Sequence, residues 1–131
     1  MRMQIIAGML MVALPPGDVH AMEWPQKHED CMARMPANQR EINECARLEY
    51  LESERELNSL YQRLLKVDPN ASALSEAQRA WLHFRDKVCL YEQGFAQPGG
   101  SAAGMYHQDC LTRHTRRRIE DLRRGLQKYQ H

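Results

Sequence analysis

Three long stretches of the sequence carry apolar residues at every third or fourth position, and this spacing constrains the fold more than any other feature. An α-helix has about 3.6 residues per turn, so residues with this spacing share one face of a helix. The stretches run from about residue 39 to 67, from 75 to 94 and from 109 to 129. None of them shows the two-residue alternation of a half-buried strand. The sequence therefore predicts an all-α fold.

Residues typical of helix ends flank the first two stretches. Asn38 is followed by Glu41 three residues later, and Ser75 is followed by Gln78 at the same distance. This is the spacing of a capping box, in which the two side chains bond to backbone N–H groups at the start of a helix. Asp68-Pro69-Asn70 separates the two stretches. We therefore expect helices to begin after Asn38 and at Ser75.

Each predicted helix has an apolar face that must be buried against its neighbours. The face of the second helix would hold Ala77, Trp81, Phe84, Val88 and Tyr91. A glycine-rich segment follows, too rich in small residues for a regular element, and it is predicted to be a loop. Three helices with short connections favour an antiparallel three-helix bundle.

Residues 1–21 have the pattern of a secretory signal peptide. One basic residue is followed by an apolar run from Ile5 to Leu14, then by Pro15-Pro16-Gly17 and the small-residue site at Ala21. An apolar run of this length is too short to cross a bilayer core, which takes about 20 residues. We therefore expect cleavage to leave a mature domain of residues 22–131, periplasmic or secreted and without stable membrane insertion.

The four cysteines, Cys31, Cys45, Cys89 and Cys110, form an even set in a short chain that is expected to be exported. Such a set favours two disulfides formed in an oxidising compartment. Cys89 and Cys110 lie on either side of the predicted loop, which favours pairing them with each other and Cys31 with Cys45. The alternative, Cys45 with Cys89 and Cys31 with Cys110, stays open.

A metal site and an enzyme active site are both disfavoured by the motifs. His107, Cys110 and His114 would share one helix face and offer a zinc alternative, but the other cysteines lack the close C-x2-C neighbour that zinc sites use. The sequence has no nucleophile elbow, zinc-protease motif or phosphate-binding loop. We therefore expect a binding protein without a cofactor or metal rather than an enzyme.

The charges are divided between two helices. The net charge is +1, from 18 Lys and Arg against 17 Asp and Glu, which does not favour a nucleic-acid binder. From Glu41 to Glu56 the local balance is −4 (six acids, two bases), and from Arg113 to Lys128 it is +5 (seven bases, two acids). Opposite charges should draw the first and third helices together.

Several short blocks of sequence carry a family resemblance. The most specific is Ala77-Gln78-Arg79-Ala80-Trp81-Leu82, followed by Arg85-Asp86 and Cys89. The others are Cys45-Ala46, residues 56–61, Gly99-Gly100-Ser101, and Cys110-Leu111 with Thr115 and Arg118. Together, these blocks resemble the LprI-like lysozyme-inhibitor domain over roughly residues 31 to 122. The resemblance implies an exported, all-helical, disulfide-bonded bacterial domain that inhibits lysozyme.

Some residues in these blocks are predicted to be structural. Trp81 and Tyr61 lie on apolar helix faces and are expected in the core. Asn58 and Gln78 lie at comparable distances from the turn at residue 70, so their amides are expected to bond to each other across the helix pair. Arg85 and Asp86 are interpreted either as an ion pair near the loop or as part of a solvated face.

Two surfaces are candidates for binding a protein partner, which the resemblance suggests is a lysozyme-like muramidase. The first is an acidic strip formed by Glu41, Glu44, Glu49 and Glu52, which could steer a basic partner. The second is the loop, with Phe95, Gly99, Gly100, Ser101 and Tyr106, unless it is only a connector. The alternative functions are an envelope-stress or immunity protein with a different partner and no lysozyme affinity, or a small cell-wall or ligand-binding bundle.

Overall fold

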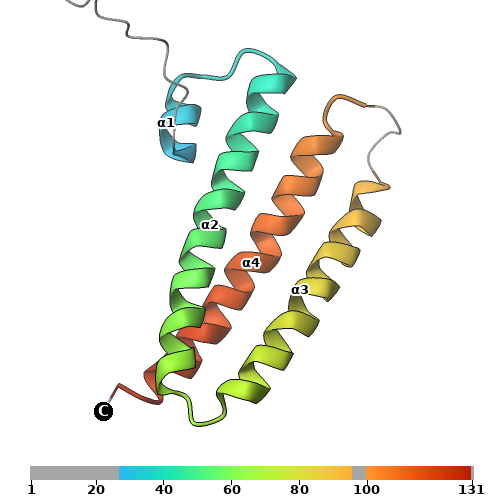
Figure 1. Ribbon diagram of the computed structural model, residues 1–131. Coiled ribbons are helices and arrows are strands. Elements are labelled where there is room, and N and C mark those ends of the chain that lie inside the picture. The colour runs from blue at the N-terminus through green and yellow to red at the C-terminus, as the bar shows by residue number, and fades with distance from the viewer. Residues whose placement is uncertain (1–26, 96–99, 131) are drawn as a thin grey trace, which may run out of the picture.

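The computed structural model describes residues 27–95 and 100–130, and this part of the chain contains helices and no strands (Figure 1). The helices are α1 (His28–Ala33), α2 (Gln39–Val67), α3 (Ala71–Gln93) and α4 (Ala103–Gln127). The three long helices confirm the predicted all-α fold, and the short α1 is an addition to it. The predicted signal peptide lies outside the described residues.

Consecutive long helices run in opposite directions, as expected for an antiparallel bundle, so α2 and α4 run parallel to each other (Figure 1). The most extensive contact in the molecule joins α2 and α4. α3 packs mainly on α4 and contacts α2 much less. No described helix combines the length and the apolar character needed to span a membrane.

A cluster of six aliphatic side chains, here called the leucine core, fills the bundle between the second halves of α2 and α4. Its members are Leu57, Leu60, Leu64, Ile119, Leu122 and Leu126, all at most 7% exposed. Tyr61, Leu74 and Trp81 pack against it and are partly buried. Burial of apolar surface contributes about 25 cal/mol per Å². The leucine core therefore stabilises the end of the bundle near the α2–α3 turn, which we call the turn end.

The buried face of α3 differs from the apolar face that the spacing predicted. Phe84 and Tyr91 are 56% and 68% exposed, whereas Gln78, Arg85 and Cys89 are buried. The buried polar side chains find partners on neighbouring helices, which offsets the cost of removing them from water. Trp81 and Val88 are partly buried and pack against core clusters, so the expected apolar face was right for these two residues and wrong for Phe84 and Tyr91.

The cap of α2 is confirmed, because the Glu41 N–H donates to Asn38 Oδ1 at 3.0 Å and the Glu41 carboxylate accepts from the Ala37 N–H at 2.8 Å. The expected start at Ser75 was wrong, since α3 begins four residues earlier, at Ala71. Its N-cap residue, Asn70, makes no capping bond through its side chain. α4 likewise begins before the expected residue 109.

Two disulfides hold the other end of the bundle together. Cys31 is bonded to Cys45 and Cys89 to Cys110, each pair with Cα atoms 5.5 Å apart. This confirms the favoured pairing. The first disulfide ties α1 to α2, and the second ties the end of α3 to the beginning of α4 across the loop. We call this disulfide-bonded end, with α1 and the residues around the loop, the loop end.

Candidate functional site

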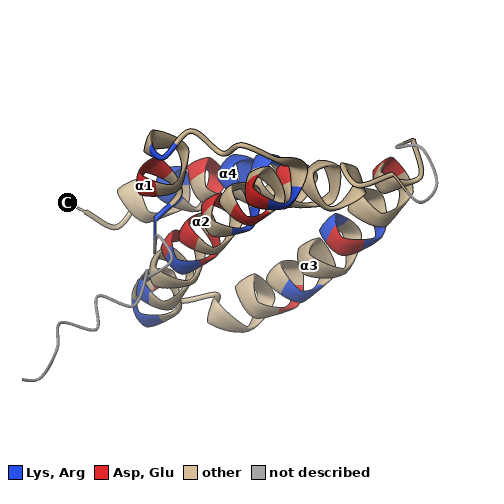
Figure 2. Ribbon diagram, turned by 90° about the horizontal axis from the view of Figure 1, so that it is seen from above, with Lys and Arg blue, Asp and Glu red and all other residues tan. Residues whose placement is uncertain are grey.

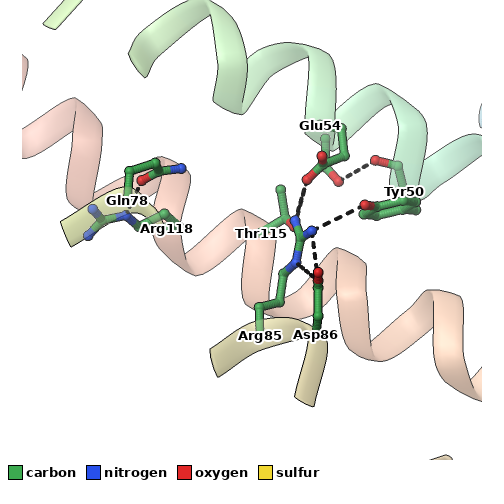
Figure 3. A network of polar contacts seen from close by, with 8 residues as sticks. Tyr50, Glu54, Gln78, Arg85, Asp86, Thr115 and Arg118 are labelled. Atoms are coloured by element: carbon green, nitrogen blue, oxygen red, sulfur yellow. Dashed lines mark hydrogen bonds and ion pairs between the residues drawn. The ribbon is translucent and has the colours of Figure 1, made fainter. Parts of the chain in front are cut away.

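A buried arginine joins the three long helices next to the loop end (Figure 3). Arg85 of α3 is only 4% exposed. Its guanidinium donates to Glu54 of α2, to Thr115 Oγ1 of α4 at 3.1 Å and to Asp86 Oδ1 at 3.0 Å. The predicted Arg85–Asp86 pair is therefore present, but Asp86 is exposed and the arginine also pairs with the partly buried Glu54. These bonds use the donors of Arg85 internally, so the arginine fixes the helices relative to one another.

The electrostatics of this cluster keep Arg85 charged. Burial is the largest single influence and lowers the pKa of the guanidinium, but the charge of Glu54, the nearby Tyr50 and the hydrogen bonds to Asp86 and Glu54 together outweigh it, so the pKa is raised. Burial raises the pKa of Tyr50, whose hydroxyl lies 3.4 Å from Arg85 Nη2, and the positive charge of Arg85 partly offsets that rise. The guanidinium also lies 5.1 Å from the centre of the Trp81 ring, within cation–π range.

Gln78 and Asn58 do not bond to each other. Gln78 Oε1 accepts from Arg118 Nε of α4 at 3.0 Å, as Figure 3 shows, while Asn58 is exposed. The predicted amide bridge was wrong because α3 packs mainly on α4 rather than on α2. Arg118 also lies 5.8 Å from the centre of the Trp81 ring. The Gln-Arg-Ala-Trp-Leu block thus contributes the α3 side of the contact with α4.

The acidic strip on α2 is largely engaged in contacts within the molecule. Glu41 caps α2, and Glu44 accepts two bonds from Arg47, which lower the pKa of Glu44. Glu49 pairs with Arg116 of α4 at 2.6 Å, and Glu52 accepts from the backbone N–H of residue 28 at 2.9 Å. These carboxylates therefore cap, pair and tether helices, which weakens the interpretation of the strip as a surface for a partner.

The expected attraction between the first and third predicted helices, α2 and α4, is realised. Figure 2 shows acidic residues of α2 beside basic residues of α4. Besides the Glu49–Arg116 pair, Arg123 pairs with Glu56. Both pairs are partly solvated, and such pairs contribute little each, so the charges favour this arrangement without carrying its stability.

Described residues on either side of residues 96–99 line a hollow at the loop end, here called the loop hollow. Phe95 is 72% exposed and Tyr106 is 53% exposed. Together with Glu92, Gly100 and Ser101, they line a hollow of about 470 Å³. The backbone carbonyl of Ser101 accepts from Asn43 Nδ2 at 2.8 Å, which holds this segment against α2. Gly99, the remaining residue predicted here, lies outside the described residues.

A second hollow, here called the α1 pocket, lies between α1, α2 and α4 and is also lined by Tyr106. Its volume is about 340 Å³ and its lining is mainly apolar. The lining includes Met32, Ile42, Met105, Glu49 and Asp109. The sequence does not reveal this pocket because its walls come from three separate segments. The only sequence feature that could have indicated it is the presence of Met32 and Met105, because methionine side chains suit irregular binding surfaces.

The structure brings together a different group of candidate zinc ligands from the one in the zinc alternative. Cys110 and His114 lie near Cys89 rather than in a group with His107, with the three candidate ligand atoms within 4.8 Å of one another. Both sulfurs are joined in the Cys89–Cys110 disulfide and therefore offer no thiolate to a metal. The His107 ring instead lies 3.4 Å from the Cys89 carbonyl oxygen. His107, which the disfavoured zinc alternative named, is therefore not part of the group that the structure brings together.

The fold and these surfaces define a small, disulfide-bonded, all-helical domain with two hollows around an exposed tyrosine. The sequence profile of the family described as "Lysozyme inhibitor LprI" matches residues 31–122. The chain belongs to this family. An uncharacterized protein of Rhizobium meliloti (strain 1021) is 33% identical over 113 residues, covering 75% of this chain and 79% of the relative. No solved structure matches the chain. The family and the disulfides are consistent with an exported protein.

Proposed function

We propose that this protein is an exported inhibitor that binds a lysozyme-like muramidase by direct protein contact, using its loop end. The observation that carries the proposal is the match to the lysozyme-inhibitor family over residues 31–122. A single domain of this size inhibits most simply by occupying the surface of its target.

Exposed aromatic side chains favour the loop end. Phe95 and Tyr106 border the loop hollow, and the ring of Tyr91 packs edge-on against Phe95 with centroids 5.0 Å apart. Aromatic residues are enriched among those that carry most of the binding energy in protein interfaces. They also occur here next to concave surface, where a partner's side chain can be enclosed. The loop end therefore offers the anchors that a protein interface needs.

The disulfides favour the same face by restricting its motion. The Cys89–Cys110 bond ties the two helix ends between which the loop runs, and the Asn43 side chain fixes Ser101 against α2. A surface that is ordered before binding loses less conformational entropy when the complex forms. More of the contact energy then remains as affinity.

The test is the lysis of a peptidoglycan suspension by purified lysozymes of several classes, with and without the exported form of this protein. We expect lysis to slow for at least one class, with Phe95→Ser and Tyr106→Ser each weakening inhibition about tenfold, which corresponds to about 1.4 kcal/mol. Tyr129→Ser, which removes an exposed aromatic from the last residues at the turn end, is the matched control and should inhibit normally.

Two outcomes would count against the proposal in different ways. If a several-fold molar excess leaves every lysozyme class active, the muramidase partner is wrong and a periplasmic pull-down should identify an envelope partner instead. If inhibition occurs but both loop-end variants match the control, the partner is right and the contact face is wrong.

A further inference from the structure

The α1 pocket differs from the loop hollow in its walls. Met32 of α1, Ile42 of α2 and Met105 of α4 contribute the apolar part, and Tyr106 lines both the pocket and the loop hollow. Its volume of about 340 Å³ is at the low end of the range of ligand sites. A space of this size suits one long side chain of a partner better than a large ligand.

Apart from His28, the titratable side chains that define the charge of the pocket are acidic. Among the described residues, Glu49 and Asp109 line it, and no Lys or Arg does. Glu49 is already paired with Arg116 at 2.6 Å. Asp109, by contrast, is exposed and has no hydrogen bond or ion pair anywhere in residues 27–95 and 100–130. One carboxylate is therefore available to a positive group that enters the pocket.

We propose that the α1 pocket receives a Lys or Arg side chain of the muramidase, an inference that rests on the proposed function and specifies its contact. The aliphatic stem of the side chain lies against Met32, Ile42 and Met105, and its cation reaches the carboxylate of Asp109. Lys and Arg bury their stems on apolar surface while keeping the charged group near water or a counter-ion. Methionine side chains adapt to such a stem because they are flexible and polarisable.

Other side chains fit the pocket less well. An acidic side chain would meet the like charge of Asp109 and Glu49, which disfavours it. A short apolar side chain would contact the methionines but leave the carboxylate without a partner. A cation on a long aliphatic stem contacts both the apolar lining and the carboxylate of Asp109. Its bond to the carboxylate is a charge-assisted hydrogen bond, which is stronger than a neutral one.

The wall supplied by α1 is held in place before any partner arrives. The Cys31–Cys45 disulfide ties α1 to α2, and His28 Nδ1 lies 2.9 Å from the Cys45 carbonyl oxygen. The backbone N–H of His28 also donates to the carboxylate of Glu52 at 2.9 Å. Without such tethers, a six-residue helix would have to be ordered upon binding, at a cost in conformational entropy.

The test uses two variants of the pocket in the full exported chain, with chicken-type lysozyme as the probe and calorimetry to measure the Kd. Asp109→Asn removes the charge without breaking a contact in the described structure, and Ala46→Trp fills the pocket, which Ala46 lines. We expect each to raise the Kd about five- to tenfold. Glu76→Gln and Ala80→Trp, at exposed positions of α3, are the matched controls and should stay within about twofold of the wild type. Melting curves check that each variant is folded.

The outcomes separate this inference from the proposed function. If wild-type protein binds the lysozyme and both pocket variants bind equally well, the function stands and the pocket assignment is wrong. If wild-type protein neither binds this lysozyme nor inhibits any class in the lysis assay, the proposed function fails, and the pocket is tested with a blocked oligo-arginine peptide and methyl-labelled methionines. Shifts of the Met32 and Met105 signals that Asp109→Asn abolishes support a cation pocket, and their absence at millimolar peptide overturns it.

Discussion

At the turn end, aliphatic side chains of α2 and α4 fill the interior, whereas near the loop end the interior holds two disulfides and a buried arginine. Hydrophobic burial is non-directional and depends on filled volume. Crosslinks and ion pairs are directional and hold the helices together without continuous apolar packing. The loop end can therefore carry hollows that a packed leucine core leaves no room for.

The largest effect is expected from a cavity at the turn end. Leu57 is 1% exposed, and Leu57→Ala should lower the free energy of unfolding by about 2 to 5 kcal/mol, since a buried leucine loses both its transfer energy and its contacts. The same truncation at Leu90, which is 56% exposed near the loop end, should cost within about 0.5 kcal/mol. Urea unfolding measures both values. Similar losses for the two variants would remove the proposed contrast between the ends.

An intermediate effect is expected from the arginine. Arg85→Met should lower the free energy of unfolding by about 3 kcal/mol, because it leaves the partly buried carboxylate of Glu54 without its cation. The double variant with Glu54→Gln should lose less than Arg85→Met alone. The control is Arg123→Met at the turn end, where the broken pair with Glu56 is exposed and should cost about 0.2 to 1 kcal/mol. If the two arginine variants were equally stable in urea, burial would not distinguish these ion pairs.

The smallest effect is expected from a single proton near the loop disulfide. Burial and the charge of Arg113 lower the pKa of His114 in the folded chain. The unfolded chain, with a histidine pKa near about 6.5, therefore takes up the proton first as the pH falls. Stability from this group is complete above that pH and is lost as the pH drops toward the lowered pKa of the folded state.

His114→Gln should accordingly reduce the fall in Tm between pH 7.5 and 5.5 relative to the wild type. His83→Gln is the matched control, because this histidine is exposed on α3, and it should retain the wild-type fall in Tm. Equal pH dependence in all three proteins would mean that His114 is solvated in the same way in the folded and unfolded chains.

The bounds of α2 could be predicted from the sequence because both of its ends carry local signals. Asn38 caps it and the helix ends just before Asp68-Pro69, as the sequence predicts. The start of α3 could not, since its N-cap Asn70 uses no side-chain bond and Ser75 lies inside the helix. The short α1 also escaped prediction, because a disulfide and a histidine contact hold it rather than an apolar periodicity.

The candidate site was predictable only in part, for a related reason. Glycine content marked the loop, and Phe95 and Tyr106 do border a hollow there. The acidic residues of α2 looked like a surface because their partners are distant in sequence, as Arg116 is from Glu49. The buried polar side chains of α3 and the α1 pocket likewise depend on contacts between residues that are distant in sequence. Pairings between segments decide which residues remain available, and a single sequence does not display them.

The parallel arrangement of α2 and α4 has a consequence for how the chain folds. Leu57 and Ile119, which share the leucine core, are separated in sequence by the whole of α3. Helical bundles generally fold fast because their contacts are local, and the rate falls as contacting residues lie further apart along the chain. Here the principal core cannot form until the chain has reversed direction twice. Closing the Cys89–Cys110 bond early would shorten that search by fixing the second reversal.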